Sequence, residues 1–202
     1  MQKVMMFIDY ENFEIARQNL YKDQFGKGDS SYHAPRINLV KLPHKVATKL
    51  SVDYKLIKTF LFVPEPDDFL IKESWRKKKY DFLKGLGNTD FFTVISGRHV
   101  ARQLTETPPQ PYDKTTYFVD EKGTDINMAV QLITKAYHNA YDTAVILSGD
   151  TDYLPIYDIL NTIGKTVVVV GVKPQNLSKF KSHSDKQLIL DLPLLQDCEK
   201  TT

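Results

Sequence analysis

The segment from Glu121 to Pro155 reads EKGTDINMAVQLITKAYHNAYDTAVILSGDTDYLP and predicts a helix, a strand and a second helix in succession. After Asp125, apolar residues recur at helical spacing over residues 126–140, and one face of this helix carries Ile126, Ala129, Val130, Ile133 and Tyr137. Residues 143–147 are typical of a buried strand, and an SGDTD turn leads from them to a helix over residues 153–163. Such a junction is typical of the edge at which an open α/β sheet builds its site.

The rest of the chain continues this alternation. Apolar runs predict further strands at residues 4–8, within 52–63, and at 91–96, 166–170 and 187–190. Helical spacing predicts helices over residues 13–21, 38–50, 67–85 and 176–181. Repeated strand–helix units imply an α/β fold in a three-layer α/β/α arrangement, with a mainly parallel, Rossmann-like central sheet.

Three features mark the less regular parts of the chain. Residues 22–36 are polar and contain glycine and serine, so we expect a loop there. Residues 98–105 and 114–120 resemble the arms of a hairpin around three prolines, which predicts a hairpin-like insertion at 98–120. Pro64 and Pro66 are expected to end the strand within 52–63. A chain of 202 residues is expected to form a single domain over residues 1–202.

Composition limits the classes of function. Hydrophobic residues make up 42% and charged residues 26%, as in ordinary globular proteins, and the net charge of +2 means that any affinity for nucleic acid must come from local patches. Cys198 is the single cysteine, which excludes an internal disulfide framework and a cysteine-rich zinc site, and the five histidines show no metal-ligand spacing. No apolar run has the length of a signal peptide or a membrane span, so we expect a soluble, cytoplasmic protein without membrane association.

Four aspartates follow the ends of predicted strands or begin predicted helices: Asp9, Asp125, Asp150 and Asp152. Because the carboxyl ends of parallel strands share one edge of a sheet, these residues are expected to converge. Clustered carboxylates repel one another, and Mg²⁺ or Mn²⁺ would compensate them. Each aspartate taken alone is better explained as a helix cap, so the metal hypothesis depends on convergence.

Three motifs resemble those of the NYN domain family, a group of PIN-like, metal-dependent nucleases that includes LabA-like bacterial proteins. They are D-x-x-N at Asp9 and Asn12, K-G-x-D at Lys122, Gly123 and Asp125, and S-G-D-x-D at Ser148, Gly149, Asp150 and Asp152. The resemblance implies a PIN-like fold and a metal-dependent (endo)ribonuclease that cleaves single-stranded or structured RNA. It also implies that the four aspartates bind Mg²⁺ or Mn²⁺, that Asn12 and Ser148 support catalysis, and that Lys122 lies near the substrate.

This sequence departs from the family pattern after the first aspartate, where Tyr10 and Glu11 replace a small residue. Tyr10 is a candidate for stacking on a base or for packing, and Glu11 is either an additional acid or the start of a helix. Gly123 and Gly149 fit positions that need a tight turn or close approach.

Basic and aromatic residues alternate in residues 72–84, which include Trp75 and Tyr80, and they suggest a path for a nucleic-acid strand. Arg98, His99 and Arg102 form a second candidate patch. A lysine-rich helix is also typical of an ordinary solvated face.

Two other functions stay open. One is a non-catalytic RNA-binding or regulatory module on the same fold. The other is a haloacid-dehalogenase-like phosphatase, in which a second aspartate is expected at the position of Glu11. Assembly into a homo-oligomer also stays open.

Overall fold

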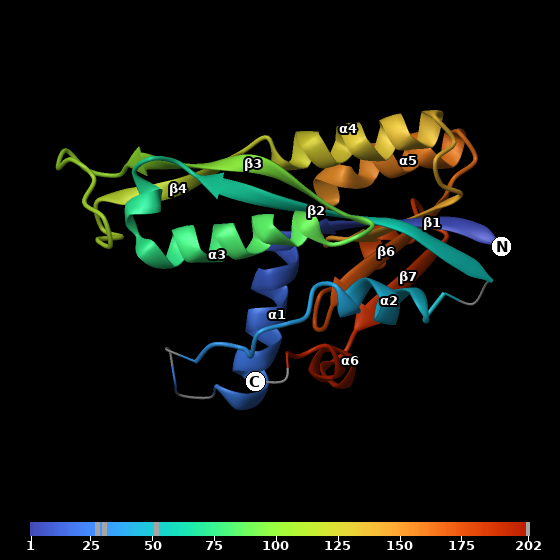
Figure 1. Ribbon diagram of the computed structural model, residues 1–202, viewed down its shortest axis with the longest axis horizontal. Coiled ribbons are helices and arrows are strands. Elements are labelled where there is room, and N and C mark those ends of the chain that lie inside the picture. Colours follow the sequence, from blue (N-terminus) through green and yellow to red (C-terminus); the bar gives the residue numbers. More distant parts are fainter. Residues whose placement is uncertain (27–28, 30–31, 51–52, 201–202) are drawn as a thin grey trace.

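The computed structural model describes residues 1–26, 29, 32–50 and 53–200, and its centre is a seven-stranded sheet in the order β4-β3-β2-β1-β5-β6-β7 (Figure 1). The strands are β1 (Gln2–Asp9), β2 (Tyr54–Pro66), β3 (Phe92–Gln103), β4 (Tyr117–Lys122), β5 (Thr143–Leu147), β6 (Thr166–Val172) and β7 (Lys186–Leu190). All neighbouring strands pair in parallel except β3 and β4, which are antiparallel. The fold is therefore α/β, as predicted, with a mixed sheet.

Helices lie against both faces of the sheet. They are α1 (Tyr10–Phe25), α2 (Lys41–Ala47), α3 (Ser74–Gly85), α4 (Thr124–Tyr137), α5 (Leu154–Thr162) and α6 (Leu192–Asp197). In Figure 1, α4 and α5 lie above the sheet, and the other four helices lie below it. Two apolar clusters fill these two interfaces, and β1 contributes to both because its side chains alternate between the faces. The predicted apolar run of the first strand thus reflects burial on both sides.

Strand β2 continues past Pro64 and ends at Pro66, so the prediction that Pro64 ends this strand is wrong. The N–H groups of Thr59 and Asp67 donate towards β3, at 2.9 Å each, and N–H direction alternates along a strand. The backbone nitrogen atoms of Pro64 and Pro66, at even-numbered positions, therefore face the other side of β2. There the neighbour β1 has already ended, with Asp9 opposite Phe62. The missing N–H groups consequently cost no ladder hydrogen bond.

The predicted hairpin is present, but its first arm is not separate from the preceding strand. Residues 91–96 and 98–105 were expected as two elements, and β3 runs through both because it pairs with β2 on one side and with β4 on the other. The loop beyond β3 is attached to the start of α3 through buried Glu73. Its carboxylate accepts from Tyr112 N at 2.9 Å, from Arg76 Nε at 2.6 Å and from the Tyr117 hydroxyl.

These donors hold Glu73 as a buried anion. Burial alone would raise the pKa of this carboxyl group, but the hydrogen bonds from Tyr117, Arg76 and the Tyr112 backbone outweigh it and bring the pKa down to about 2. The hairpin and α3 are therefore joined by a charged contact that persists through the neutral range.

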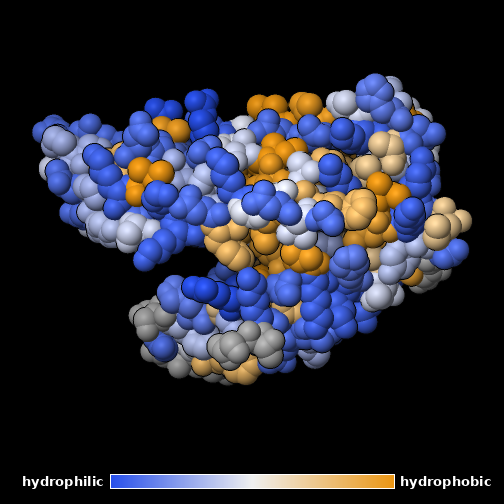
Figure 2. All heavy atoms as spheres, viewed as in Figure 1, coloured by the Kyte–Doolittle hydropathy of each residue, from blue (hydrophilic) through white to orange (hydrophobic). Residues whose placement is uncertain are grey.

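The predicted apolar face of the helix after Asp125 is wrong. Ile126, Val130 and Tyr137 are 69, 51 and 67% exposed, and apolar atoms gather over α4 in Figure 2. The buried positions are Thr124, Met128, Leu132 and Ala136. Both sets recur at helical spacing, so periodicity alone does not distinguish them; packing against the strands selects the second set.

The ends of several other helices and strands also differ from the predicted ones. Helix α1 begins at Tyr10 and continues to Phe25, so it enters the predicted loop at 22–36, of which residues 27, 28, 30 and 31 lie outside the described part. Helix α2 is shorter than predicted and holds Pro43 in its first turn. Strand β6 passes Gly171, and the helix predicted at 176–181 is a 3₁₀ turn at Ser178–Phe180. Helix α6 was not predicted.

Candidate active site

Asp9 and Ser148 lie side by side because β1 and β5 are parallel neighbours and Ile8 pairs with Leu147 directly before them. The Ser148 hydroxyl donates to Asp9 Oδ2 at 3.0 Å. Asp9 Oδ1 accepts from Asn12 N at 3.2 Å and caps α1. Only 5% of the Asp9 surface is exposed. Asp9 is thus both a helix cap and a buried acid at the carboxyl edge of the sheet.

The SGDTD turn is connected to Asp9 through Ser148. Asp150 N donates to Ser148 Oγ at 3.2 Å, while Asp150 Oδ1 accepts from Asp152 N at 2.9 Å and caps a 3₁₀ turn at Thr151–Tyr153. Ser148 therefore links the first acid of the chain to the acidic turn some 139 residues later. Asp152 itself is exposed.

Asn12 supports the same turn from the other side. Its Oδ1 accepts from Gly149 N at 2.8 Å and from Gln175 Nε2 at 3.3 Å, and Gln175 Oε1 accepts from Val172 N at 2.8 Å. A Cβ atom on Gly149 would lie 2.6 Å from Gln175 Nε2, so a larger residue here would displace the Gln175 side chain from Asn12. Gln175 was not predicted, because it lies in no motif.

Asp125 lies in the first turn of α4, which begins directly after Gly123, and the φ of 80° at Gly123 favours a glycine. The hydroxyl of Tyr153 donates to Asp125 Oδ1 at 2.7 Å. Tyr153 is buried and follows the SGDTD turn, so it connects this turn to the start of α4. Sequence reasoning missed it, although its place directly after the motif was a usable signal.

The carboxyl groups at this edge interact electrostatically. Burial raises the pKa of Asp9 to about 7, and the charges of Asp125 and Glu121 add to this effect against the hydrogen bonds from Asn12 and Ser148. Burial also raises the pKa of Asp125, with contributions from Glu121, Asp150 and Asp152. The structure therefore brings the four predicted aspartates into one electrostatic neighbourhood.

The four aspartates are more widely spaced than the ligands of a closed metal site. Among the described residues, the group whose ligand atoms all lie within 4.8 Å of one another is Glu11, His99 and Glu121, and no three of the aspartates meet this spacing. Nearby, the Tyr157 hydroxyl is fully buried and has no hydrogen-bond partner in the described part of the chain. Burial raises the pKa of Tyr157, and the charges of Asp150 and Asp9 raise it further.

A cleft of about 400 Å³ lies next to the acidic edge, between the start of α1, α3 and the β3–β4 hairpin. Figure 2 shows the surface hollowed between the part that carries α3 and the part that carries α1. The cleft is lined by Tyr10, Glu11, Pro64, Pro66, Trp75, Arg76, Lys79, Tyr80, Leu83, His99, Lys114, Val119 and Glu121. It combines carboxylates, cations and aromatic rings.

The predicted substrate-binding residues do not all lie in the cleft. Tyr10 lines the cleft, and Lys79 Nζ lies 4.9 Å from the centre of its ring. Arg98 faces Lys122 across the hairpin, on the opposite side from His99 and Glu121. Lys122 and Arg102 contact Asp120 at 2.9 and 3.4 Å. Of the predicted basic segment, Trp75, Arg76 and Lys79 reach the cleft together with Tyr80.

Comparison with known proteins agrees with these motifs and this fold. The sequence model of the NYN domain matches residues 74–191, more than half of the chain, and the protein belongs to this nuclease-like family. The matched residues include Asp125, Ser148, Asp150 and Asp152, while Asp9 and Asn12 precede them. A comparison with curated proteins gave no match.

One similar solved structure is the crystal structure of a protein of unknown function, VPA0982, from Vibrio parahaemolyticus. It is 14% identical to this chain, with a TM-score of 0.56, and the alignment covers 95% of this chain and 94% of that chain. The likeness therefore extends over the whole fold and concerns the fold alone.

We predict that Asp9→Asn stabilises the metal-free protein at pH 8. The folded-state pKa of Asp9, about 7, exceeds the ordinary aspartate value of 3.8, so the folded state retains a proton that the unfolded state has lost. Stability consequently falls as pH rises from about 4 to 7, by up to about 4 kcal/mol. The melting temperature of the variant should exceed that of the wild type by on the order of 10 °C at pH 8.

The difference between the two proteins should shrink towards pH 4, measured by thermal melts in the presence of a chelator. Asp68→Asn, at an exposed position, is the control and should show no such trend. If the difference in melting temperature between the wild type and Asp9→Asn did not change with pH, this would contradict a buried Asp9 carboxyl group with a raised pKa.

Proposed function

We propose that this protein is a divalent-metal-dependent nuclease that hydrolyses RNA phosphodiester bonds. The observation that carries the proposal is Asp9, a buried carboxyl group with a pKa of about 7, fixed by Asn12 and Ser148 among further acids at the edge of the sheet. Burying such a group among other acids costs stability when its charge is not compensated, which fits a role in binding a cation. Membership of the NYN family supports the same reaction class.

The donor set suits Mg²⁺ or Mn²⁺. Carboxylate oxygens are the ligands that these hard cations prefer, and Mg²⁺ commonly uses only one or two carboxylates and keeps several waters. The open spacing of the four aspartates is compatible with such a hydrated ion. The hydroxyl of buried Tyr157, which has no hydrogen-bond partner among the described residues, adds a polar atom near Asp150 and Asp9 that can donate a hydrogen bond to bound water or accept one from it.

In this proposal Asp9, Asp125, Asp150 and Asp152 hold the ion, and other side chains position them. Ser148 orients Asp9 and the Asp150 turn through one hydroxyl. Asn12 accepts from the backbone N–H of Gly149 and is itself held by Gln175, and Tyr153 fixes Asp125. When bound, the ion would lower the pKa of water and stabilise negative charge on the phosphoryl group.

The adjacent cleft gives the RNA strand a path. Trp75 is 46% exposed, and its ring lies 4.5 Å from Arg76 Cζ and 5.6 Å from Lys114 Nζ. An exposed ring flanked by two cations suits base stacking beside a phosphate. On the opposite face of the hairpin, exposed Arg98 offers a further phosphate contact, whereas Asp120 partly neutralises Arg102 and Lys122.

Cleavage assays test the proposed reaction directly. The wild type should cleave labelled single-stranded RNA in the presence of Mn²⁺ or Mg²⁺ and lose activity with a chelator. Asp9→Asn and Asp150→Asn should each reduce the rate by at least about 100-fold, because each removes a carboxylate from the proposed site. The products should be resolved on denaturing gels.

Asp158→Asn serves as the matched control, because Asp158 contacts His183 on the surface at 2.6 Å and lies outside the proposed site. It should retain full activity. Intact RNA after incubation with the wild type and either metal, or equal cleavage by the wild type and both site variants, would refute the nuclease. Release of phosphate from a small monoester instead would indicate a phosphatase.

The proposed RNA path gives a separate prediction. Trp75→Ala should weaken binding of single-stranded RNA by about 5- to 150-fold, which corresponds to the loss of one stacked base. Phe82→Ala is the control, because Phe82 is an exposed aromatic residue on the same helix that does not line the cleft. Fluorescence anisotropy without divalent ions would measure both; equal affinities of the two variants would place the strand elsewhere.

A further inference from the structure

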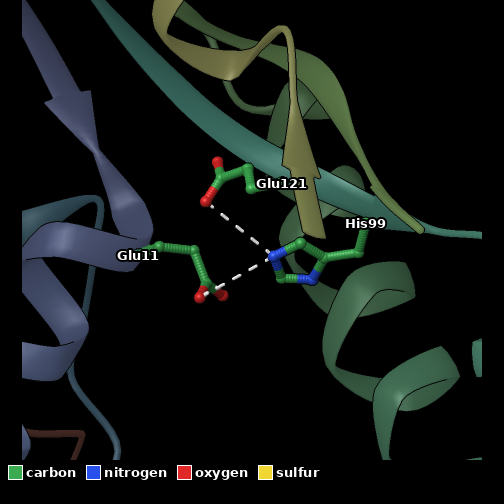
Figure 3. A group of neighbouring side chains, drawn as sticks. All are labelled: Glu11, His99 and Glu121. Carbon is green, nitrogen blue, oxygen red and sulfur yellow. Dashed lines mark ion pairs between the residues drawn. The ribbon is translucent and has the colours of Figure 1, made fainter. Parts of the chain in front are cut away.

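Three side chains from separate elements meet at the inner end of the cleft: Glu11 of α1, His99 of β3 and Glu121 of β4 (Figure 3). One ligand atom of each lies within 4.8 Å of the others. His99 Nε2 is 3.9 Å from Glu11 Oε2 and 3.9 Å from Glu121 Oε2. Figure 3 shows both carboxylates directed at this nitrogen.

The fold holds these three residues in place. His99 and Glu121 are directly opposite each other in the antiparallel β3–β4 ladder, so their side chains project from the same face. Glu11 is the second residue of α1, whose start is fixed by the Asp9 cap. Their arrangement therefore follows from the sheet register and the helix start.

Direct hydrogen bonding does not account for the arrangement. A separation of 3.9 Å is too long for a charge-assisted hydrogen bond, which is normally about 2.7 to 2.9 Å. Lys79 Nζ reaches Glu11 Oε1 only at 3.5 Å. The two carboxylates and the imidazole thus surround a space that none of these contacts closes.

The dimensions of this space suit a metal ion. Ligand atoms at about 2.1 Å from a metal are about 3.0 Å apart at a right angle and about 3.4 Å apart at the tetrahedral angle. The two imidazole–carboxylate separations of 3.9 Å therefore need to contract by about half an ångström to one ångström, and the two carboxylate oxygens lie within 4.8 Å of each other. The side chains of His99, Glu11 and Glu121 are 13, 25 and 33% exposed, so the cleft gives a cation access.

We propose that Glu11, His99 and Glu121 form a second divalent-cation site, separate from the aspartates. Two carboxylates with one imidazole favour Mn²⁺ or Zn²⁺ over Mg²⁺, because nitrogen ligands suit transition metals and oxygen-only sets suit Mg²⁺. Glu121 also acts electrostatically on Asp9 and Asp125, so a cation held here would relieve repulsion at the aspartate edge. The proposal does not depend on nuclease activity.

Mn²⁺ binding to the full chain tests this site. Counting bound Mn²⁺ by electron paramagnetic resonance should give one ion fewer per chain for His99→Gln than for the wild type. Spin-echo modulation should detect nitrogen coupled to Mn²⁺ in the wild type and not in His99→Gln. Glu121→Gln should weaken the nitrogen-coupled site at least about tenfold, and Zn²⁺ should displace Mn²⁺ from it more readily than Mg²⁺ does.

Two further variants make the result specific. His138→Gln, at an exposed position at the end of α4, should keep the full signal. Asp125→Asn should keep the nitrogen coupling and lose the Mn²⁺ that the aspartates hold. The two sites are therefore tested separately, and a failure of the proposed nuclease site can be distinguished from a failure of this site. Thermal melts establish that each variant is folded. Unchanged Mn²⁺ binding by folded His99→Gln, or no nitrogen coupling in the wild type, would overturn the proposal.

Discussion

The placement of the Asp9 carboxylate is the constraint on which the rest of the site depends. Asp9 lies at the end of the central strand, caps α1 and accepts the Ser148 hydroxyl, so one buried carboxyl group joins two strands and a helix. Burial beside other acids makes its ionised form costly, and its hydrogen bonds recover only part of this cost. Asp9 therefore both caps α1 and belongs to the cluster of acids.

Of the three motifs, K-G-x-D follows β4, which is antiparallel to β3. The other two, D-x-x-N and S-G-D-x-D, predicted the acidic edge because they follow β1 and β5, whose ends are fixed by their parallel pairing. Asp9, Ser148 and Asp150 are connected for this reason. The partners that hold them were less predictable. Gln175 acts through hydrogen bonds with Asn12 and Val172 and lies in no motif, and Tyr153 acts through one hydrogen bond to Asp125 that long-range packing creates.

Long-range contacts that the local sequence does not report also explain the errors in the predicted fold. Helix α4 carries two apolar stripes, and only contact with the sheet decides that Met128 and Leu132 are buried while Ile126 is exposed. Pro64 remains inside β2 because the neighbouring strand has ended, which local sequence does not report. The Glu11, His99 and Glu121 group likewise depends on the register of a hairpin whose residues are distant in sequence from α1.

We propose that the aspartate edge binds a divalent cation. Anomalous diffraction from crystals soaked in Mn²⁺ would locate such an ion. We predict a peak within about 2.2 Å of carboxylate oxygens from Asp9 or its neighbours Asp125 and Asp150. Ordered carboxylates at this edge without any Mn²⁺ peak, in crystals saturated with the ion, would contradict it.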